Sequence, residues 1–192
     1  MSAPKRLVVN ADDFGFTPDV NAGILEAFER GIVRSTTLMA NGAAFDDAVR
    51  LARQNPGLDV GCHLTLIGRP GLPSSLPALL RALVRRRLPV YAELAGQVRR
   101  VLDAGIRPTH LDTHKHTHLL PPVLGLVCRI AQEFAIPWVR KPFLFRPRGC
   151  RTTDHFTGFA LTGRLDTAAS GNWKPSPHRR SERLWKPPRC NW

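Results

Sequence analysis

The sequence predicts an α/β protein whose parallel strands form a TIM-like (β/α) barrel. Short apolar segments alternate with amphipathic helical segments as far as residue 140, and this alternation favours parallel strands joined by right-handed crossovers, in a barrel or an open sheet. Candidate catalytic side chains also fall where three predicted strands end, the edge at which barrels carry active sites. The chain has 192 residues, whereas a complete barrel takes roughly 250. We therefore expect a barrel that is incomplete at its C-terminal end.

Helix signals follow most of the predicted strands. The first helix is expected from Pro18 to Arg30, because Thr17 can cap it, proline suits its first position and Gly31 can end it. Apolar periodicity predicts the later helices. These cover residues 45–55, 76–101 with a break near Pro89, and 121–135.

Strands are predicted in five short segments between these helices. Most are rich in apolar or β-branched residues, as half-buried strands are. They cover residues 6–10, 35–41 and 58–66, a histidine-rich segment that begins after Pro108, and residues 138–140.

The histidine-rich segment, residues 109–118, is the strongest chemical signal in the chain. It holds four of the seven histidines and one aspartate, and imidazole and carboxylate groups bind divalent cations. If the backbone is extended, every second residue points to one face. One metal takes only three or four of these side chains, and a solvated histidine-rich loop is the alternative. The alternating residues are His110, Asp112, His114, His116 and His118.

Two other predicted strands add groups suited to the same metal. Asp12 and Asp13 lie where the first strand meets the first helix, and His63 lies inside an apolar segment. Taken alone, adjacent aspartates are typical of turns or caps, and a single histidine among apolar residues is typical of a core. Because Asp13, His63 and His114 each end a different strand, we expect them to meet at one metal.

Four short motifs follow one another along the chain. They are residues 10–15 (Asn-Ala-Asp-Asp-Phe-Gly), 35–37 (Ser-Thr-Thr), 61–63 (Gly-Cys-His) and 109–114 (Thr-His-Leu-Asp-Thr-His). In this order and spacing they resemble the YdjC-like, or ChbG/HpnK, carbohydrate deacetylases, and the resemblance extends from about Arg6 to Ala169. It implies a distorted TIM-like barrel that removes N-acetyl groups from an amino sugar or chito-oligosaccharide with the help of a metal, and some relatives are linked to hopanoid biosynthesis.

The resemblance assigns roles to four of the candidate residues. Asp13, His63 and His114 match the metal ligands of the family, and Asp12 matches its catalytic base. A cation would polarise the amide carbonyl and acidify a bound water, while a nearby carboxylate takes the proton of that water.

The remaining polar residues and the metal itself are less sharply assigned. Asp112 can orient a ligand imidazole by accepting its second N–H, whereas His116 and His118 are candidates for substrate contact. The family implies Mg²⁺, but one carboxylate with two imidazoles also suits Zn²⁺ or Mn²⁺.

The segment 170–192 differs from the rest of the chain, so residues 1–169 are expected to form the deacetylase-like domain. Its 23 residues hold three tryptophans, six Lys or Arg and one acidic residue. The family implies a catalytic histidine near the C-terminal end, which this chain lacks; His155 and His178 are the candidate substitutes. We interpret residues 170–192 as an aberrant, disordered tail from truncation or a frameshift, and expect metal binding with weak or no catalysis.

The formal net charge of +13 leaves two other functions open. A basic chain can bind nucleic acid nonspecifically, but no recognisable nucleic-acid module is present. A metal-dependent phosphoesterase is the other alternative, although the chain lacks a Gly-rich phosphate loop. Because the sequence has no signal peptide, no membrane-spanning segment and no paired cysteine motif, we expect a cytoplasmic protein with a small carbohydrate substrate, compatible with a homo-oligomer.

Overall fold

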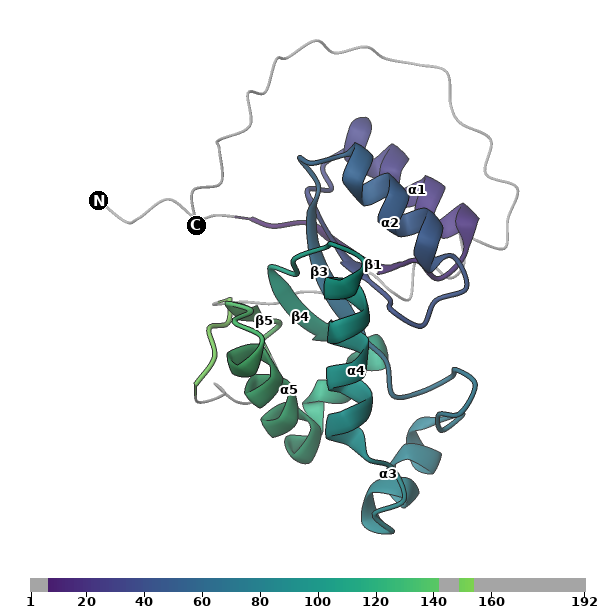
Figure 1. The fold of residues 1–192 in the computed structure, drawn as a ribbon, viewed down its shortest axis with the longest axis vertical. Helices are drawn as coiled ribbons and strands as arrows, with labels where there is room; N and C mark the ends of the chain where they lie inside the picture. The colour runs from purple at the N-terminus through teal and green to yellow at the C-terminus, as the bar shows by residue number, and fades with distance from the viewer. Residues whose placement is uncertain (1–6, 142–148, 154–192) are drawn as a thin grey trace. The chain divides into compact units, whose positions relative to one another are not determined.

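The computed structural model describes residues 7–141 and 149–153 (Figure 1). Its strands form one parallel sheet in the order β1-β2-β3-β4-β5. Each crossover therefore adds the next strand on the same side, as in a (β/α) barrel, whereas a doubly wound sheet reverses its strand order. This order confirms the predicted α/β fold. The strands are β1 (Asn10–Phe14), β2 (Ser35–Leu38), β3 (Asp59–Leu64), β4 (His110–Thr113) and β5 (Trp138–Val139).

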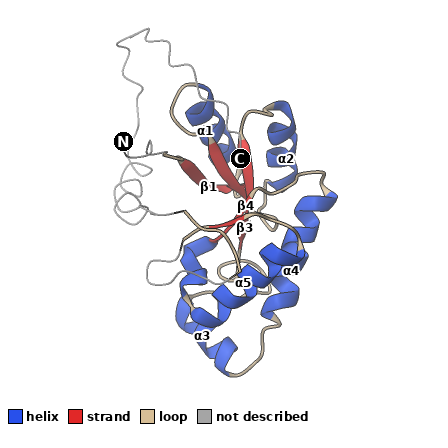
Figure 2. Cartoon of the chain, turned by 90° about the vertical axis from the view of Figure 1, so that its left-hand side faces the viewer, coloured by secondary structure: helices blue, strands red, loops and turns tan. Residues whose placement is uncertain are grey.

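Helices connect the strands and pack in neighbouring pairs. Helix α1 contacts α2, and α4 contacts α5; both pairs lie side by side in Figure 1, and the second pair also does in Figure 2. The helix boundaries lie within a few residues of those predicted, with the break near Pro89 separating two helices. The helices are α1 (Pro18–Glu29), α2 (Phe45–Gln54), α3 (Leu76–Val84), α4 (Val90–Asp103) and α5 (Pro121–Glu133), with a 3-10 helix, η1 (His114–Leu119).

The two faces of the sheet differ in chemistry. One face packs against the helices and contributes apolar side chains to the core, among them Leu38, Val60, Cys62, Leu64, Leu111 and Val139. Because successive side chains in a strand alternate between faces, the residues between them lie on the opposite, inner face. The inner face is polar and carries Asn10, Asp12, Ser35, Thr37, Asp59, His63, His110 and Asp112.

The predicted first strand at residues 6–10 was wrong in position. β1 begins at Asn10, while Leu7 and Val8 are 84% and 49% exposed. The prediction rested on the apolar residues before Asn10. The inner face of β1 is polar, however, and its pairing with β2 begins at Asn10 and Ser35. The observed strand β1 therefore includes Asp12 and Asp13.

The backbone of the histidine-rich segment is extended only in its first part, and the strand ends next to His114, close to the strand end that the sequence predicted. β4 ends at Thr113, and the chain then turns into η1, in which Lys115 and His116 have φ values of 52° and 51°. The five alternating residues consequently do not share one face. Only His110 and Asp112 remain on the inner face of the strand.

Several sequence-based expectations concern residues outside the described part of the chain. These are the tail at 170–192 and the candidate substitutes His155 and His178. Among the described residues, no helix is both long enough and apolar enough to cross a membrane.

Candidate metal centre

Adjacent carboxylates at the end of β1 both reach the same site because the strand is irregular there. In a regular strand, neighbouring side chains point to opposite faces. The pairing of β1 with β2 shifts register between Ala11 and Phe14, and Asp13 has a positive φ of 66°. An irregularity of this kind redirects a side chain, and aspartate adopts this left-handed backbone more readily than most residues. Asp12 and Asp13 can therefore contribute to one centre.

Asp13, His63 and His114 converge from the ends of β1, β3 and β4. Oδ1 of Asp13 lies 3.1 Å from Nε2 of His63 and 2.9 Å from Nδ1 of His114. One donor atom from each of the three side chains lies within 4.8 Å of the other two. Burial opposes ionisation of Asp13, but hydrogen bonds from His114 and His63 hold its pKa well below the usual range. An ionised carboxylate with two imidazoles is a donor set that fits a divalent cation.

Asp112 orients the His63 ring. Its Oδ1 lies 2.6 Å from Nδ1 of His63, and both side chains are buried. Since an ionised carboxylate only accepts hydrogen bonds, Nδ1 carries the proton and Nε2 faces Asp13. Burial would lower the pKa of His63, but Asp112 and the neighbouring Asp13 and Asp12 raise it to about 10. This geometry leaves Nε2 as the nitrogen for a cation.

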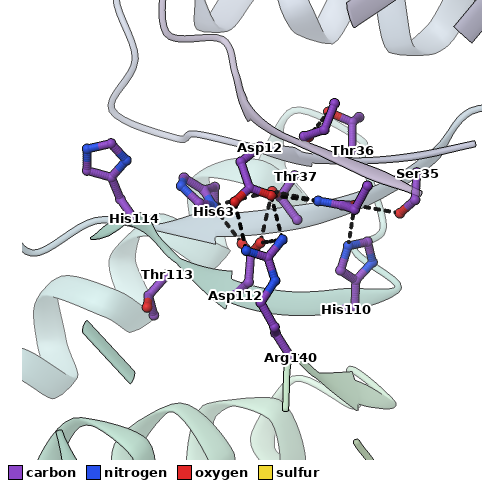
Figure 3. A network of polar contacts seen from close by, with 12 residues as sticks. Asp12, Ser35, Thr36, Thr37, His63, His110, Asp112, Thr113, His114 and Arg140 are labelled. Carbon is purple, nitrogen blue, oxygen red and sulfur yellow. Dashed lines mark hydrogen bonds and ion pairs between the residues drawn. The ribbon is translucent and has the colours of Figure 1, made fainter. Parts of the chain in front are cut away.

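Arg140, the residue after β5, joins the two inner carboxylates (Figure 3). Its guanidinium contacts both oxygens of Asp12, at 2.7 and 2.5 Å, and Oδ2 of Asp112 at 2.5 Å. Burial favours the neutral guanidine, but Asp112 and Asp12 keep the pKa of Arg140 above its usual value. Burial would likewise raise the pKa of Asp112, but Arg140 and His63 hold it far below the usual range. Sequence reasoning missed Arg140; its place at the end of a predicted strand was the available signal.

A second group of potential ligands, made of Asp12, His63 and Asp112, also lies close together. Arg140 already pairs with both of these carboxylates, so a cation there would meet its positive charge. Thr37 contributes a further contact, because its hydroxyl donates to Oδ2 of Asp112 at 3.2 Å. The cluster around Asp13 is therefore the better candidate for the metal.

The other predicted histidines lie outside this cluster. His118 is buried, its Nδ1 lies 2.6 Å from the hydroxyl of Thr113, and burial lowers its pKa to about 4. The His116 ring lies against it, with ring centroids 6.0 Å apart. His110 contacts Asn10 instead of the metal cluster, with 3.2 Å between Nε2 and Oδ1. None of these three residues belongs to the group of potential ligands around Asp13.

Relatives of known name resemble most of this chain. A carbohydrate deacetylase of Geobacillus stearothermophilus is 42% identical over 163 residues, which cover 80% of this chain and 66% of the relative. One of Brevibacillus brevis is 40% identical over 178 residues, covering 82% and 71%. A chitooligosaccharide deacetylase of Klebsiella pneumoniae is 43% identical over 145 residues, covering 68% and 57%. The chain thus spans about two thirds of the length of the first two relatives.

A solved structure and a family model agree with these relatives. A crystal structure of an Enterococcus faecalis V583 protein, named for cellobiose-phosphate cleavage, superposes with a TM-score of 0.68 at 29% identity and covers 88% of this chain and 78% of its own. The model of the YdjC-like protein family matches residues 6–182, which extends past the limit of the resemblance at residue 169. From its matched length and its named relatives, we conclude that this chain belongs to the YdjC-like family.

Proposed function

We propose that the chain is a metal-dependent hydrolase that removes N-acetyl groups from amino sugars or chito-oligosaccharides. The observation that carries the proposal is the convergence of Asp13, His63 and His114, from three separate strands, on one point beside Asp12. The names of the relatives support the reaction, since they are carbohydrate and chitooligosaccharide deacetylases.

Asp13, His63 and His114 would hold a divalent cation. Such a cation polarises an amide carbonyl and lowers the pKa of a bound water. The carboxylate with two imidazoles suits Zn²⁺ or Mn²⁺, and Mg²⁺ is the metal that the family resemblance implies. Asp112 contributes by fixing the ring of His63, so that Nε2 keeps its orientation whichever cation binds.

Asp12 is the proposed base that takes a proton from the attacking water. One of its oxygens lies within 4.8 Å of a ring nitrogen of His63, so its carboxylate lies beside the cation-binding cluster. Arg140 contacts both of its oxygens, which restricts the directions in which the carboxylate can accept a proton. A base held in one orientation needs no search for the reactive geometry.

Metal retention and acetate release together test the proposal. The purified chain is stripped with a chelator, reloaded with Mn²⁺, Zn²⁺ or Mg²⁺, and incubated with an N-acetylated chito-oligosaccharide. We expect bound metal and slow, metal-dependent acetate release, both lost in His63→Ala and His114→Ala. Cys62→Ala is the matched control, because Cys62 is next to His63 but packs in the core on the other face.

Two outcomes would overturn the proposal. One is full metal retention by a variant that lacks both His63 and His114. The other is phosphate release from a generic phosphoester with no acetate release from any N-acetylated sugar. The second outcome would favour a phosphoesterase at the same centre.

A further inference from the structure

A second polar cluster lies on the inner face of the sheet, next to the metal centre and separate from its proposed ligands. It is formed by Asn10 at the start of β1, Ser35 at the start of β2, His110 at the start of β4 and Thr109 directly before it. Figure 3 shows Ser35 and His110 approaching one another from these strands, on the far side of Asp12 from His114. The proposed reaction gives these residues no direct role.

The hydrogen bonds of the Asn10 amide have only one consistent direction. Nδ2 of Asn10 lies 2.8 Å from Oδ1 of Asp12, and a carboxylate accepts, so the nitrogen must face Asp12. Oδ1 of Asn10 is then an acceptor on the other side. It receives the hydroxyl of Ser35 at 2.7 Å and faces Nε2 of His110 at 3.2 Å.

This direction fixes the tautomer of His110. Because Oδ1 of Asn10 can only accept, Nε2 of His110 must carry the hydrogen. Nδ1 then accepts the hydroxyl of Thr109 at 2.8 Å. The nearest carboxylate, Asp59, has its Oδ2 3.8 Å from Nδ1, which is too far for a hydrogen bond. The chain of donors therefore runs from Thr109 through His110 and Asn10 to Asp12.

Gly61 makes room for the His110 ring. A Cβ atom on Gly61 would lie 2.6 Å from both Cε1 and Nε2 of that ring, and 2.7 Å from Cδ2. Real Cβ atoms do not approach other atoms so closely, and the ring has no flexible end that could move away. Because Gly61 has no side chain, the imidazole of His110 fits beside β3, where it contacts Asn10.

We infer that Asn10 and His110 are positioning residues that aim the Asp12 carboxylate through this chain of hydrogen bonds. Oδ1 of Asp12 is held by Asn10 and Arg140, and Oδ2 by Arg140. Without the Asn10 amide, the carboxylate can pivot on the guanidinium. The inference rests on the proposed function, in which Asp12 takes the proton of the water.

The kinetic test compares two substitutions of His110 in the metal-loaded chain. His110→Leu removes the donor to Asn10, and we expect kcat for acetate release to fall about 10-fold, the lower end of what outer-shell partners contribute. KM and Mn²⁺ affinity should stay the same, because no ligand of the cation is touched. His110→Gln places an amide N–H near the position of Nε2 and should recover most of the loss. An unchanged kcat in His110→Leu, or an altered Mn²⁺ affinity with no kcat effect, would overturn the inference.

A second, milder substitution tests the same chain of hydrogen bonds with less risk of misfolding. Thr109→Val keeps the shape of the side chain but removes the hydroxyl that fixes Nδ1, and we expect a smaller loss of kcat with the same KM. Thr36→Val is its matched control, because the Thr36 hydroxyl donates to the backbone carbonyl of Ala11 and lies outside this chain of donors. Equal kcat in Thr109→Val and Thr36→Val, with both folded, would contradict the inference.

Nitrogen-15 NMR of the histidine rings separates this inference from the proposed function. We expect His110 to be the Nε2–H tautomer, shifting toward a tautomer mixture in Thr109→Val. The Nδ1–H form in the unsubstituted chain would overturn the inference whatever the reaction. If the Nε2–H form is found but the unsubstituted chain releases no acetate, the hydrogen-bond chain stands and the proposed reaction fails.

Discussion

The helix-facing and inner faces of the same five strands stabilise the molecule in different ways. On the helix-facing side, apolar residues such as Leu111 are fully buried and stabilise the fold by removing surface from water. On the inner side, Asp112 is equally buried but charged, so it is tolerated only because Arg140 and His63 compensate it. The helix-facing side therefore tolerates changes of side-chain shape poorly, and the inner side tolerates changes of charge poorly.

The largest effect on stability is expected from removing the positive charge of Arg140, which Asp12 and Asp112 share. Arg140→Met leaves Asp12 and Asp112 without their common partner, so we expect a loss of about 3–5 kcal/mol in the free energy of unfolding, measured by urea denaturation. Arg140→Lys keeps the charge but cannot contact both carboxylates in the same way, and should lose less. A stability equal to that of the unsubstituted chain in Arg140→Met would show that the inner charges are not compensated by this residue.

A cavity on the opposite face should be nearly as damaging to the fold but harmless to the metal. Leu111→Ala removes a fully buried side chain next to Asp112 in β4, and we expect a loss of about 2–5 kcal/mol in the same denaturation experiment. Mn²⁺ affinity below the unfolding transition should not change, because the site lies on the other face. A large loss of affinity would show that the two faces are energetically coupled.

A change of one atom on the inner face should weaken the metal site as well as the fold. Asp112→Asn keeps the size of the side chain but weakens its hold on Nδ1 of His63, so we expect Mn²⁺ affinity to fall about 10- to 100-fold, measured by calorimetric titration. Asp59→Asn, at the N-terminal end of β3, is the control that removes a carboxylate from the same face. Similar losses in both variants would indicate a general effect of charge on this face.

Adjacent threonines in β2 give the finest comparison. Thr36 hydrogen-bonds the Ala11 carbonyl, and Thr37 hydrogen-bonds Asp112. Valine at either position keeps the shape and removes the hydroxyl, which costs about 1 kcal/mol of stability for each hydrogen bond lost, measured by denaturation. Only Thr37→Val should also reduce Mn²⁺ affinity, because its partner orients His63. A matching reduction in Thr36→Val would contradict the separation of the two faces.

Sequence patterns predicted the helices well and the inner face of the sheet less well. Amphipathic periodicity is a local property, so α1 and α5 appeared within a few residues of their expected ends. β1 was misplaced because apolar runs were taken to mark strands, whereas Asn10 and Asp12 occupy its inner face. The contact between Arg140 and Asp12 joins residues 128 positions apart, a pairing that no local pattern records.

The segment after β4 shows a different limit of sequence reasoning. Alternating histidines fit an extended chain, but Lys115 and His116 adopt left-handed backbone within η1, which packs against α5. The three residues expected to share a metal, Asp13, His63 and His114, were nevertheless brought together. Their positions at the ends of predicted strands were informative because the strands of the sheet follow the order of the sequence.

The positive φ of Asp13 determines which of the two adjacent aspartates faces His114, a choice that their identical side chains leave open. Asp12 and Asp13 are identical in structure, so only the path of the backbone distinguishes the acid that faces Arg140 from the acid that faces His114. Deleting one residue ahead of the pair would move Asp13 into the place of Asp12 and turn Asp12 to the opposite face of the sheet. The length of this strand is therefore as constrained as the identity of its aspartates.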